Sequence, residues 1–594
     1  MHPCSIKVDP PNLHLPRQRA RLVSSVADLH LLIVSLGAVT FIVILLGFFV
    51  YDLKSSTKVL SVNFSETKSP PPVDKGTTLV ENSGHAERHD STRGGFPSKS
   101  SSSSSGFKAK SISSEQSSVA LSAAVYTDHG ACSDIGRSIL LRGGNAMDAA
   151  IAAFLCLSAA LPHRGGLGGG LIATIHTDSR CTTLNARESC PADATEAFFI
   201  NRRDETVVGP RAVAVPAALN GLYRAFEKYS SKRLSWRRLV KPTIELCLRG
   251  ITVTKELSQD LLEFQSLIMN NSRMRSHFVN ETTAKVLAVG EKMLCPLLAN
   301  FLRDMMDADD PVEFFYRGQG SKRLLKFIGE GDGFIAPQDL EDCESEFQPG
   351  VQMFLGGHVI CGPPPPSIYS IVQLAVAVMY ESNSSSTDIP LLAWDKSKLI
   401  GDAVFDETIL DDAEQLIGKD SVQDVLKRFR NRNSPEIQYE PEEKGSFSVL
   451  VIDEKGNAVS MTSSLGDKCV PIESRSFFFL KVFRFGNREF TEFGFFMNNA
   501  MGAFTYGAQM GSMASRNAPQ PAKCPRTQMS PVIGIKDGEV SFASGGTDYL
   551  GTCTSLLGAL TSSESLQSRR TPLLFKNEDG LHSLSSDKSL LAGY

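Results

Sequence analysis

One uninterrupted apolar segment constrains this chain more than any other feature of its sequence. Residues 31–51 (LLIVSLGAVTFIVILLGFFVY) contain no charged residue, and a helix of that length is long enough to cross a hydrocarbon core of about 30 Å. A cleaved signal peptide is the competing interpretation, but its apolar core would be shorter and followed closely by small residues at the cleavage site. We therefore expect a transmembrane signal anchor. Basic residues precede it at Lys7, Arg17, Arg19 and Arg21.

The charge on the N-terminal side predicts the orientation of that anchor. By the positive-inside rule, residues 1–30 form a cytoplasmic tail and the rest of the chain is extracellular or lumenal, as in a single-pass type II membrane protein. Every cysteine except Cys4 follows the anchor, in a compartment where oxidation is expected, although no disulfide pairing can be derived. Candidate N-glycosylation tripeptides on that side begin at Asn63, Asn270, Asn280 and Asn383.

Composition separates a stalk from a globular region. Residues 52–118 are rich in Ser, Pro, Gly and charge, and such a segment buries too little apolar surface to offset its ordering entropy, so a disordered stalk is predicted. The whole chain is 42% hydrophobic with a formal net charge of -4. It carries no basic stripe interleaved with aromatics, so we expect no nucleic-acid partner.

The globular region opens with helical segments followed by a glycine cluster. Residues 135–141 read as the end of a helix, and the alanine-rich residues 146–160 as a second helix that must pack closely. The glycine cluster PHRGGLGGG at 162–170 precedes a strand-like segment at 171–176. That order is wrong for a dinucleotide site and the Lys-Ser/Thr ending of a P-loop is missing. We therefore interpret these glycines as positions of close backbone approach, and we expect no cofactor and no metal site.

A β-hairpin is predicted later in the chain. Residues 447–452 are apolar and largely β-branched, 453–457 (DEKGN) have turn chemistry, and 458–462 resume the extended pattern. Ser446 stands at the head of this hairpin. A serine there is usually only a polar edge residue, so other parts of the sequence must decide its role.

Several motifs follow one another along the globular region. They are GGNAMDAAIAAFLCLSAALPHRGGLGGG, TLNARESCPADAT, the stretch that begins AVAVPAALNGLYRAF, GPPPPS, GDAVFDET, GNAVSMTSSL and ASGGTDYL. In this order they resemble the γ-glutamyltransferase family, and most closely its divergent, membrane-anchored paralogues.

The resemblance covers residues 119–560 and implies an α+β fold of the N-terminal nucleophile hydrolase type, a four-layer αββα sandwich. In that family a proenzyme cleaves itself into a heterodimer, with a large subunit here at 119–445 and a small one at 446–560. The product transfers the γ-glutamyl group of glutathione or other γ-glutamyl compounds to water, an amino acid or a dipeptide.

The resemblance also implies catalytic residues. Aligning the turn GNAV places the family's nucleophilic Thr at Ser446 and the autocleavage bond between Gly445 and Ser446. A freed α-amine would then act as the base, as an N-terminal hydroxyl nucleophile requires. Ser464 matches a Thr that hydrogen-bonds the nucleophile. Gly545 and Gly546 match the pair whose N–H groups form the oxyanion hole.

Substrate-binding positions are matched only in part. Arg187 matches the arginine that grips the substrate α-carboxylate, although an arginine at a strand end is also expected to pair with Glu188 or solvent. The remaining substrate-binding candidates are Asn499, Thr527 and Gln528. Both acids that bind the α-ammonium in the family are missing from the segment 500–504 (AMGAF).

Two segments depart from the family pattern. Residues 477–492 (FFFLKVFRFGNREFTE) are expected to be an insertion in a surface loop, and 561–594 an atypical polar tail. Two other functions therefore stay open beside a γ-glutamyltransferase or glutathione hydrolase. One is a weak or inactive paralogue kept as a membrane-anchored binding protein. The other is an amide hydrolase for substrates without an α-ammonium group.

Overall fold

The computed structural model describes residues 123–431, 446–466, 485–507 and 515–561, with two further strands nearer the C-terminus. The expected tail, anchor and stalk lie outside the described residues, as do Asn63 and Gly445. Among the helices that are described, none combines the length and the apolar character that a membrane span needs.

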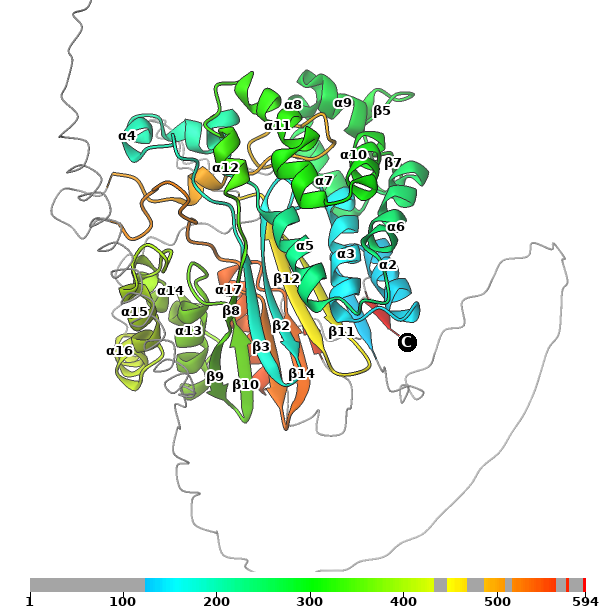
Figure 1. Cartoon of the computed structure of the whole chain (residues 1–594). Coiled ribbons are helices and arrows are strands. Elements are labelled where there is room, and N and C mark those ends of the chain that lie inside the picture. Colours follow the sequence, from blue (N-terminus) through cyan, green and yellow to red (C-terminus); the bar gives the residue numbers. More distant parts are fainter. Residues whose placement is uncertain are drawn as a thin grey trace, which may run out of the picture. The chain divides into compact units, whose positions relative to one another are not determined.

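Two β-sheets form the centre of the molecule (Figure 1). Antiparallel pairs join the strands of the first sheet throughout. Its order is β16 (Leu591–Gly593), β1 (Ala124–Thr127), β11 (Ser446–Ile452), β12 (Ala458–Ser464), β2 (Gly170–Thr177), β3 (Arg180–Ala186) and β8 (Glu346–Pro349). The second sheet has the order β15 (Leu573–Phe575), β14 (Glu539–Ser544), β13 (Val532–Lys536), β10 (His358–Gly362) and β9 (Val351–Leu355).

Helices cover the outer face of each sheet, so the described residues form helix, sheet, sheet and helix layers (Figure 1). Against the first sheet lie α2 (Gly130–Leu141), α3 (Ala146–Ala160) and α5 (Ala218–Tyr229), and α6 (Trp236–Arg249) packs on α3. Against the second lie α13 (Tyr369–Glu381) and α17 (Tyr549–Thr561), and α14 (Asp388–Trp394), α15 (Thr408–Leu416) and α16 (Lys419–Arg430) pack on α13.

Further helices, single helical turns and two small ladders complete the fold. The helices are α4 (Glu196–Phe199), α7 (Lys255–Glu263), α8 (Gln265–Asn270), α9 (Ser272–Phe278), α10 (Pro296–Asp307), α11 (Gln319–Gly329) and α12 (Pro337–Glu341). The single helical turns are η1 (Arg203–Thr206), η2 (Pro210–Ala212), η3 (Glu313–Arg317), η4 (Asp395–Leu399) and η5 (Ala500–Ala503). Two small ladders pair β4 (Ile251–Thr252) with β7 (Lys292–Met293), and β5 (Val279–Asn280) with β6 (Lys285–Val286).

Strand β11 shows why its sequence is apolar almost throughout. Phe447, Val449 and Val451 pack into the core that contains α3, whereas Leu450 and Ile452 pack against the second sheet. Because successive side chains of a strand point to opposite faces, the whole strand is buried. Ser446 therefore lies on the face that points toward the second sheet.

The local predictions for the helices and the hairpin are confirmed. Helix α3 occupies 146–160, all its residues are buried, and Asn145 begins it with a capping box to Asp148. The glycines of 162–170 also allow close approach. A Cβ on Gly168 would collide with the carbonyl oxygen of Phe496, and one on Gly169 with that of Ser464.

The expected surface loop is wrong for the part of 477–492 that the structure describes. Phe485 and Phe490 are buried, and both rings contact Phe278 of α9 and Phe496. Burial of these rings removes apolar surface from water and stabilises the fold, so the segment is part of the core. The sequence pattern indicated an insertion, but it did not reveal this aromatic partner cluster.

The region expected as a polar tail adds an edge strand to each sheet. β15 pairs in parallel with β14, and β16 pairs antiparallel with β1. These two strands hydrogen-bond to backbone groups of β14 and β1 that would otherwise lie unpaired at a sheet edge.

Two disulfides lie in this scaffold. Cys132–Cys156 joins α2 to α3, with 5.3 Å between the Cα atoms. Cys181–Cys361 joins β3 of the first sheet to β10 of the second. Both pairings agree with the expectation that the region after the anchor folds where cysteines are oxidised.

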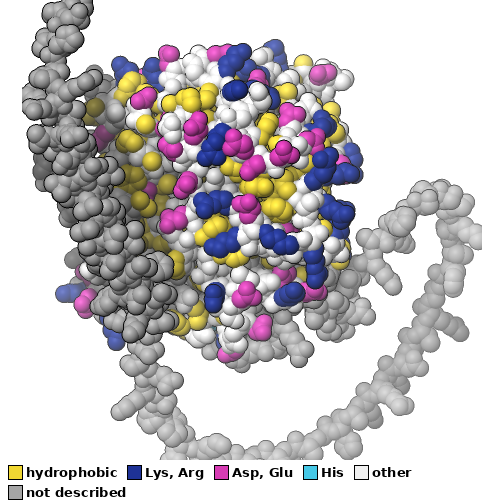
Figure 2. All heavy atoms as spheres, in the orientation of Figure 1, with side chains coloured by type: hydrophobic (Ala, Val, Ile, Leu, Met, Phe, Trp, Pro, Cys, Tyr) yellow, Lys and Arg dark blue, Asp and Glu magenta, His cyan; other side chains and the backbone are white. Residues whose placement is uncertain are grey.

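Charges of both signs are mixed on the surface. Figure 2 shows Lys and Arg side chains interspersed with Asp and Glu over the visible face of the described residues. A mixed surface of this kind fits the small net charge of -4 and offers no extended field of one sign on that face.

Candidate active site

Ser446 is the first residue of β11, and its hydroxyl lies between the two sheets. The side chain is only 4% exposed, and Oγ donates a 3.2 Å hydrogen bond to the carbonyl oxygen of Thr547. Thr547 follows directly after Gly545 and Gly546. The structure therefore brings the predicted nucleophile to the loop that carries the predicted oxyanion-hole residues.

Ser464 lies opposite Ser446 on the neighbouring strand. The two residues are register partners in the β11–β12 ladder, and Ser464 is fully buried. Its Oγ accepts a 2.9 Å hydrogen bond from the backbone N–H of Gly466. The placement fits a residue next to the nucleophile, while its contribution to catalysis stays a prediction.

Glycine is required at both positions of the Gly545–Gly546 pair. A Cβ on Gly545 would lie 2.6 Å from Oγ of Ser448, and Gly546 has φ of +60° and would place a Cβ against the carbonyl oxygen of Ser530. The Gly546 carbonyl also accepts a 2.8 Å hydrogen bond from the Ser530 backbone N–H. The loop is therefore held against the start of β11, where an oxyanion hole for Ser446 would be needed.

Hydroxyl groups line the facing surface of β11 and β12. Ser460 Oγ donates to the carbonyl oxygen of Ser544 at 2.7 Å, and Thr462 Oγ1 donates to that of Gly545. These bonds satisfy buried carbonyl groups of β14 and of the loop after it. They tie the loop to the same sheet face that presents Ser446.

Asp128 was missed by sequence reasoning. It follows β1, is 9% exposed, and its Oδ2 accepts a 2.6 Å hydrogen bond from the backbone N–H of Ser448 and a 3.5 Å bond from Ser448 Oγ. Ser448 is two residues after Ser446 on the same strand face. The available signal was the polar run Thr127-Asp128-His129 directly after an apolar strand.

Arg187 lies at the end of β3 with its guanidinium buried. Nη1 donates a 2.7 Å hydrogen bond to Oε2 of Glu188, and neither side chain is exposed. The backbone N–H of Arg187 donates to Asn185 at 3.0 Å. The structure thus shows the alternative weighed for Arg187, an ion pair with Glu188, and a substrate-binding role for Arg187 stays a prediction.

Glu188 explains part of the glycine cluster. A Cβ on Gly170 would lie 2.7 Å from Glu188 Oε2, and one on Gly169 would lie 3.2 Å from Oε1. The ion pair thus packs directly against the backbone that leads into β2. Because a buried charge is costly without a partner, Arg187 and Glu188 depend on each other.

The other predicted substrate-binding residues hydrogen-bond to backbone groups after η1, before β13 and at the start of α17. Asn499 donates from Nδ2 to the carbonyl oxygen of Val207 at 3.1 Å. Thr527 Oγ1 accepts from the Met529 N–H at 3.1 Å. Gln528 Oε1 accepts from the Tyr549 N–H at 3.3 Å. All three are buried, and binding of a substrate by them stays a prediction.

The segment after Asn499 forms η5 (Ala500–Ala503) and lies in apolar surroundings. Ala500 and Met501 pack with Phe199, Phe504 and Tyr506. The structure thus gives this turn a packing role at the place where the resemblance implies a site for an α-ammonium group.

The described residues hold no group of three or more His, Cys, Asp or Glu side chains placed to bind a metal ion. The arrangement combines a buried hydroxyl at a strand start, a glycine loop beside it and a carboxylate on the same face. It suits acyl transfer through a hydroxyl nucleophile.

Several known proteins are similar to this chain in sequence or in fold. Glutathione hydrolase 3 of Arabidopsis thaliana is 28% identical over 451 residues, covering 72% of this chain and 67% of the relative. Glutathione hydrolase proenzyme 1 of Schizosaccharomyces pombe is 28% identical over 470 residues, covering 74% and 71%. The fold resembles that of cephalosporin acylase from Bacillus halodurans, with a TM-score of 0.60 and 19% identity over 77% of this chain and 84% of the acylase.

A family assignment follows from the length of chain that is matched. Residues 132–548 match the family described as Gamma-glutamyltranspeptidase. The match runs from the first disulfide cysteine in α2 to the loop that holds Gly545 and Gly546. It includes every strand of the two sheets except β1, β15 and β16, and every residue placed around Ser446 except Asp128. The chain therefore belongs to the gamma-glutamyltranspeptidase family.

Proposed function

We propose that this protein transfers or hydrolyses the γ-glutamyl group of glutathione and related γ-glutamyl compounds, with Ser446 as the nucleophile. The observation that carries the proposal is the contact between Ser446 Oγ and the Thr547 carbonyl, next to Gly545 and Gly546. Membership of the family and relatives named glutathione hydrolase support it.

The first step makes the nucleophile. Ser446 Oγ attacks the carbonyl carbon of Gly445, the peptide C–N bond breaks, and the nitrogen becomes the α-amine of Ser446. Water then hydrolyses the resulting ester, which leaves a carboxylate on Gly445 and a free hydroxyl on Ser446. The two chains stay together as a heterodimer because β11 is central in the first sheet.

Acyl transfer uses the same hydroxyl. The α-amine of Ser446 takes the proton from Oγ as Oγ attacks the γ-glutamyl amide, and the proton passes to the departing amine. N–H groups of Gly545 and Gly546 stabilise the oxyanion, a contribution of about 3 kcal/mol for such donors. Water, an amino acid or a dipeptide then releases the γ-glutamyl group from the serine ester.

The proposed site faces the extracellular or lumenal side of a membrane, with the anchor at 31–51 holding the chain as a type II protein. Asn270 and Asn383 are exposed, as glycan acceptors must be. Asn280 is half-buried, and its Nδ2 donates to Glu291 at 2.7 Å. Occupancy at Asn270 and Asn383 with none at Asn280 is therefore the expected glycan pattern.

Intact-mass and N-terminal sequence measurements test the proposal. The wild-type protein is expected as two chains with a new N-terminus at Ser446, and Ser446→Ala as one uncleaved chain. Ser370→Ala removes a buried hydroxyl from α13 instead, so it is the control and is expected to be cleaved. The cleaved protein should release glutamate from γ-glutamyl anilides, and Ser446→Ala should not.

The second candidate is a membrane-anchored binding protein with little or no turnover. The apolar packing of η5 favours it, because the acids that hold the substrate α-ammonium in the family are absent from that turn. A single uncleaved chain in both wild type and Ser446→Ala would establish this alternative. Turnover of a glutaryl anilide without turnover of the γ-glutamyl anilide would instead establish an amide hydrolase for acyl groups lacking the amine.

A further inference from the structure

Two cysteines outside the active site lie where separate helices meet. Cys247 is in the last turn of α6, and Cys295 is the residue that precedes α10. Both are fully buried. Gly250, with φ of +91°, ends α6, and the chain then forms β4, which pairs with β7 just before Cys295.

A backbone hydrogen bond fixes the distance between the two residues. The N–H of Cys295 donates to the carbonyl oxygen of Cys247 at 3.1 Å. Standard bond lengths around that hydrogen bond keep the two Cα atoms within about 7 Å of each other. Disulfides in proteins join Cα atoms that are about 4.4–6.8 Å apart, so this pair is within range.

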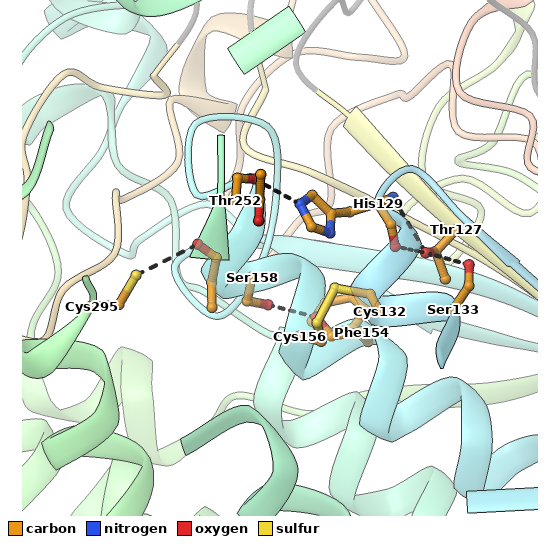
Figure 3. Close-up of a disulfide and its surroundings, with 10 residues drawn as sticks. Thr127, His129, Cys132, Ser133, Phe154, Cys156, Ser158, Thr252 and Cys295 are labelled. Carbon is orange, nitrogen blue, oxygen red and sulfur yellow. Dashed lines mark hydrogen bonds between the residues drawn. A yellow bond between two sulfur atoms is a disulfide. The ribbon is translucent and has the colours of Figure 1, made fainter. Parts of the chain in front are cut away.

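The structure holds both residues as free thiols whose side chains interact. Hydrogen bonding to the Cys247 side chain is the largest cause that raises the pKa of the Cys295 thiol, followed by burial. Cys295 Sγ lies 4.0 Å from the carbonyl oxygen of Ala159 at the end of α3 (Figure 3) and 3.8 Å from Nε2 of His277. Burial lowers the pKa of His277 to about 4.

These surroundings do not favour a reactive thiolate. A nucleophilic cysteine needs a nearby positive charge to lower its thiol pKa, whereas His277 is neutral above pH 5 and the Cys295 pKa is raised. Two adjacent thiols that are buried and protonated suit a structural bond. The oxidised pairs Cys132–Cys156 and Cys181–Cys361 lie in the same globular region.

We propose that Cys247 and Cys295 form a third disulfide in the mature protein, joining the end of α6 to the start of α10. The oxidant is a disulfide of the oxidising compartment. One cysteine attacks it to form a mixed disulfide and release one thiol. The second cysteine then displaces the other thiol, so two S–H bonds are lost, one S–S bond forms and the oxidant becomes two thiols. The exchange takes place before α6 and α10 pack, because the folded structure buries both sulfurs.

The bond closes a loop that supports the glycine cluster. Between the two cysteines lies Asp260 of α7, whose Oδ2 is 2.8 Å from Nε2 of His163. His163 begins the turn that leads to Gly168 and Gly169, against which Ser464 packs. A covalent bond at the ends of this loop limits how far Asp260 can move from His163 when the loop opens locally.

Peptide mass spectrometry of the full-length protein tests the pairing directly. The protein, produced through a secretory pathway, is denatured with N-ethylmaleimide and without reductant, then digested. We expect the Cys247 and Cys295 peptides to be recovered as one linked species, while Cys553 carries the label. Cys553 is the internal control because it is equally buried, and no other cysteine contributes to the rise in its pKa. Labelling of both Cys247 and Cys295 would overturn the proposal, as would linkage of either one to another cysteine.

Variants supply a second readout that does not depend on peptide recovery. Cys247→Ala should make Cys295 available to the label after denaturation, and Cys295→Ala should do the same for Cys247. Each should lower Tm by about 5 °C, and the double variant by no more than either single one, since one bond is lost in all three. A double variant whose Tm loss equals the sum of the two single losses would show independent side chains and refute the bond.

Discussion

The carboxylate of Asp128 binds the backbone N–H of Ser448 at 2.6 Å, across 320 residues of sequence. Ser448 is two residues after Ser446 on one strand face, and a Cβ on Gly545 would touch its side chain. Asp128 therefore fixes the strand at a point between the nucleophile and the oxyanion loop.

Asp128→Asn should slow cleavage at Ser446 and the acyl transfer that follows it. The amide is a weaker acceptor than a carboxylate, and hydrogen bonds to charged groups contribute about 1.5–3 kcal/mol, so a 10- to 100-fold loss of rate is expected. The rate of appearance of the new N-terminus measures the effect. Asp134→Asn is the control, because Asp134 lies exposed on α2. Wild-type cleavage in Asp128→Asn would show that the contact does not position Ser446.

Gly546→Ala should destabilise the protein far more than an alanine at another glycine of positive φ. At Gly546 (φ +60°) the added Cβ collides with the Ser530 carbonyl oxygen, whereas Gly538 (φ +85°) has open space around it. Gly538→Ala should cost about 1 kcal/mol from backbone strain alone, and Gly546→Ala several times more. Thermal unfolding of the two variants measures the difference. Equal losses of Tm would contradict the packing of this loop against β13.

Removal of the Cys181–Cys361 disulfide should cost more stability than removal of Cys132–Cys156. The first bond has a sequence separation of 180 and the second a separation of 24. Loop-closure entropy predicts about 5 kcal/mol for the longer loop and about 3.5 kcal/mol for the shorter. Paired alanine variants, Cys181→Ala with Cys361→Ala and Cys132→Ala with Cys156→Ala, are compared by denaturant unfolding. The reverse order would mean that packing between helices outweighs chain entropy.

The burial of His277 predicts an acid-sensitive stability. Its pKa is lowered from 6.5 to about 4 in the folded protein, so the unfolded chain binds more protons between these values. The free energy of unfolding is therefore highest above pH 6.5. It decreases by up to about 3 kcal/mol as the pH falls toward 4, because the unfolded chain binds a proton that buried His277 does not.

Unfolding curves at a series of pH values isolate that contribution. His277→Gln should flatten the fall in stability between pH 6.5 and 4 relative to wild type. Glu281→Gln is the control, because Glu281 is an exposed titratable residue nearby, and its curve should follow wild type. The same slope in wild type and His277→Gln would exclude His277 as a source of the acid sensitivity.

The sequence by itself determined the elements whose patterns are local. Helix α3, the β11–β12 hairpin and the close approach at the glycine cluster were all predicted, because propensity, turn chemistry and alternation act over a few residues. The order of motifs also predicted the family and the positions of Ser446, Ser464 and the Gly545–Gly546 pair.

Tertiary structure alone decided which groups are buried and which distant residues meet. Asp128 reaches Ser448, the neighbouring residues Arg187 and Glu188 are buried as an ion pair, and Phe485 and Phe490 join a core instead of a surface loop. The strands β15 and β16 were hidden in a polar tail because edge pairing needs little side-chain signal. Each of these contacts depends on which surfaces meet after folding. Burial of charges, aromatic rings and strand edges is a property of the assembled fold, and the local periodicity of the sequence does not encode it.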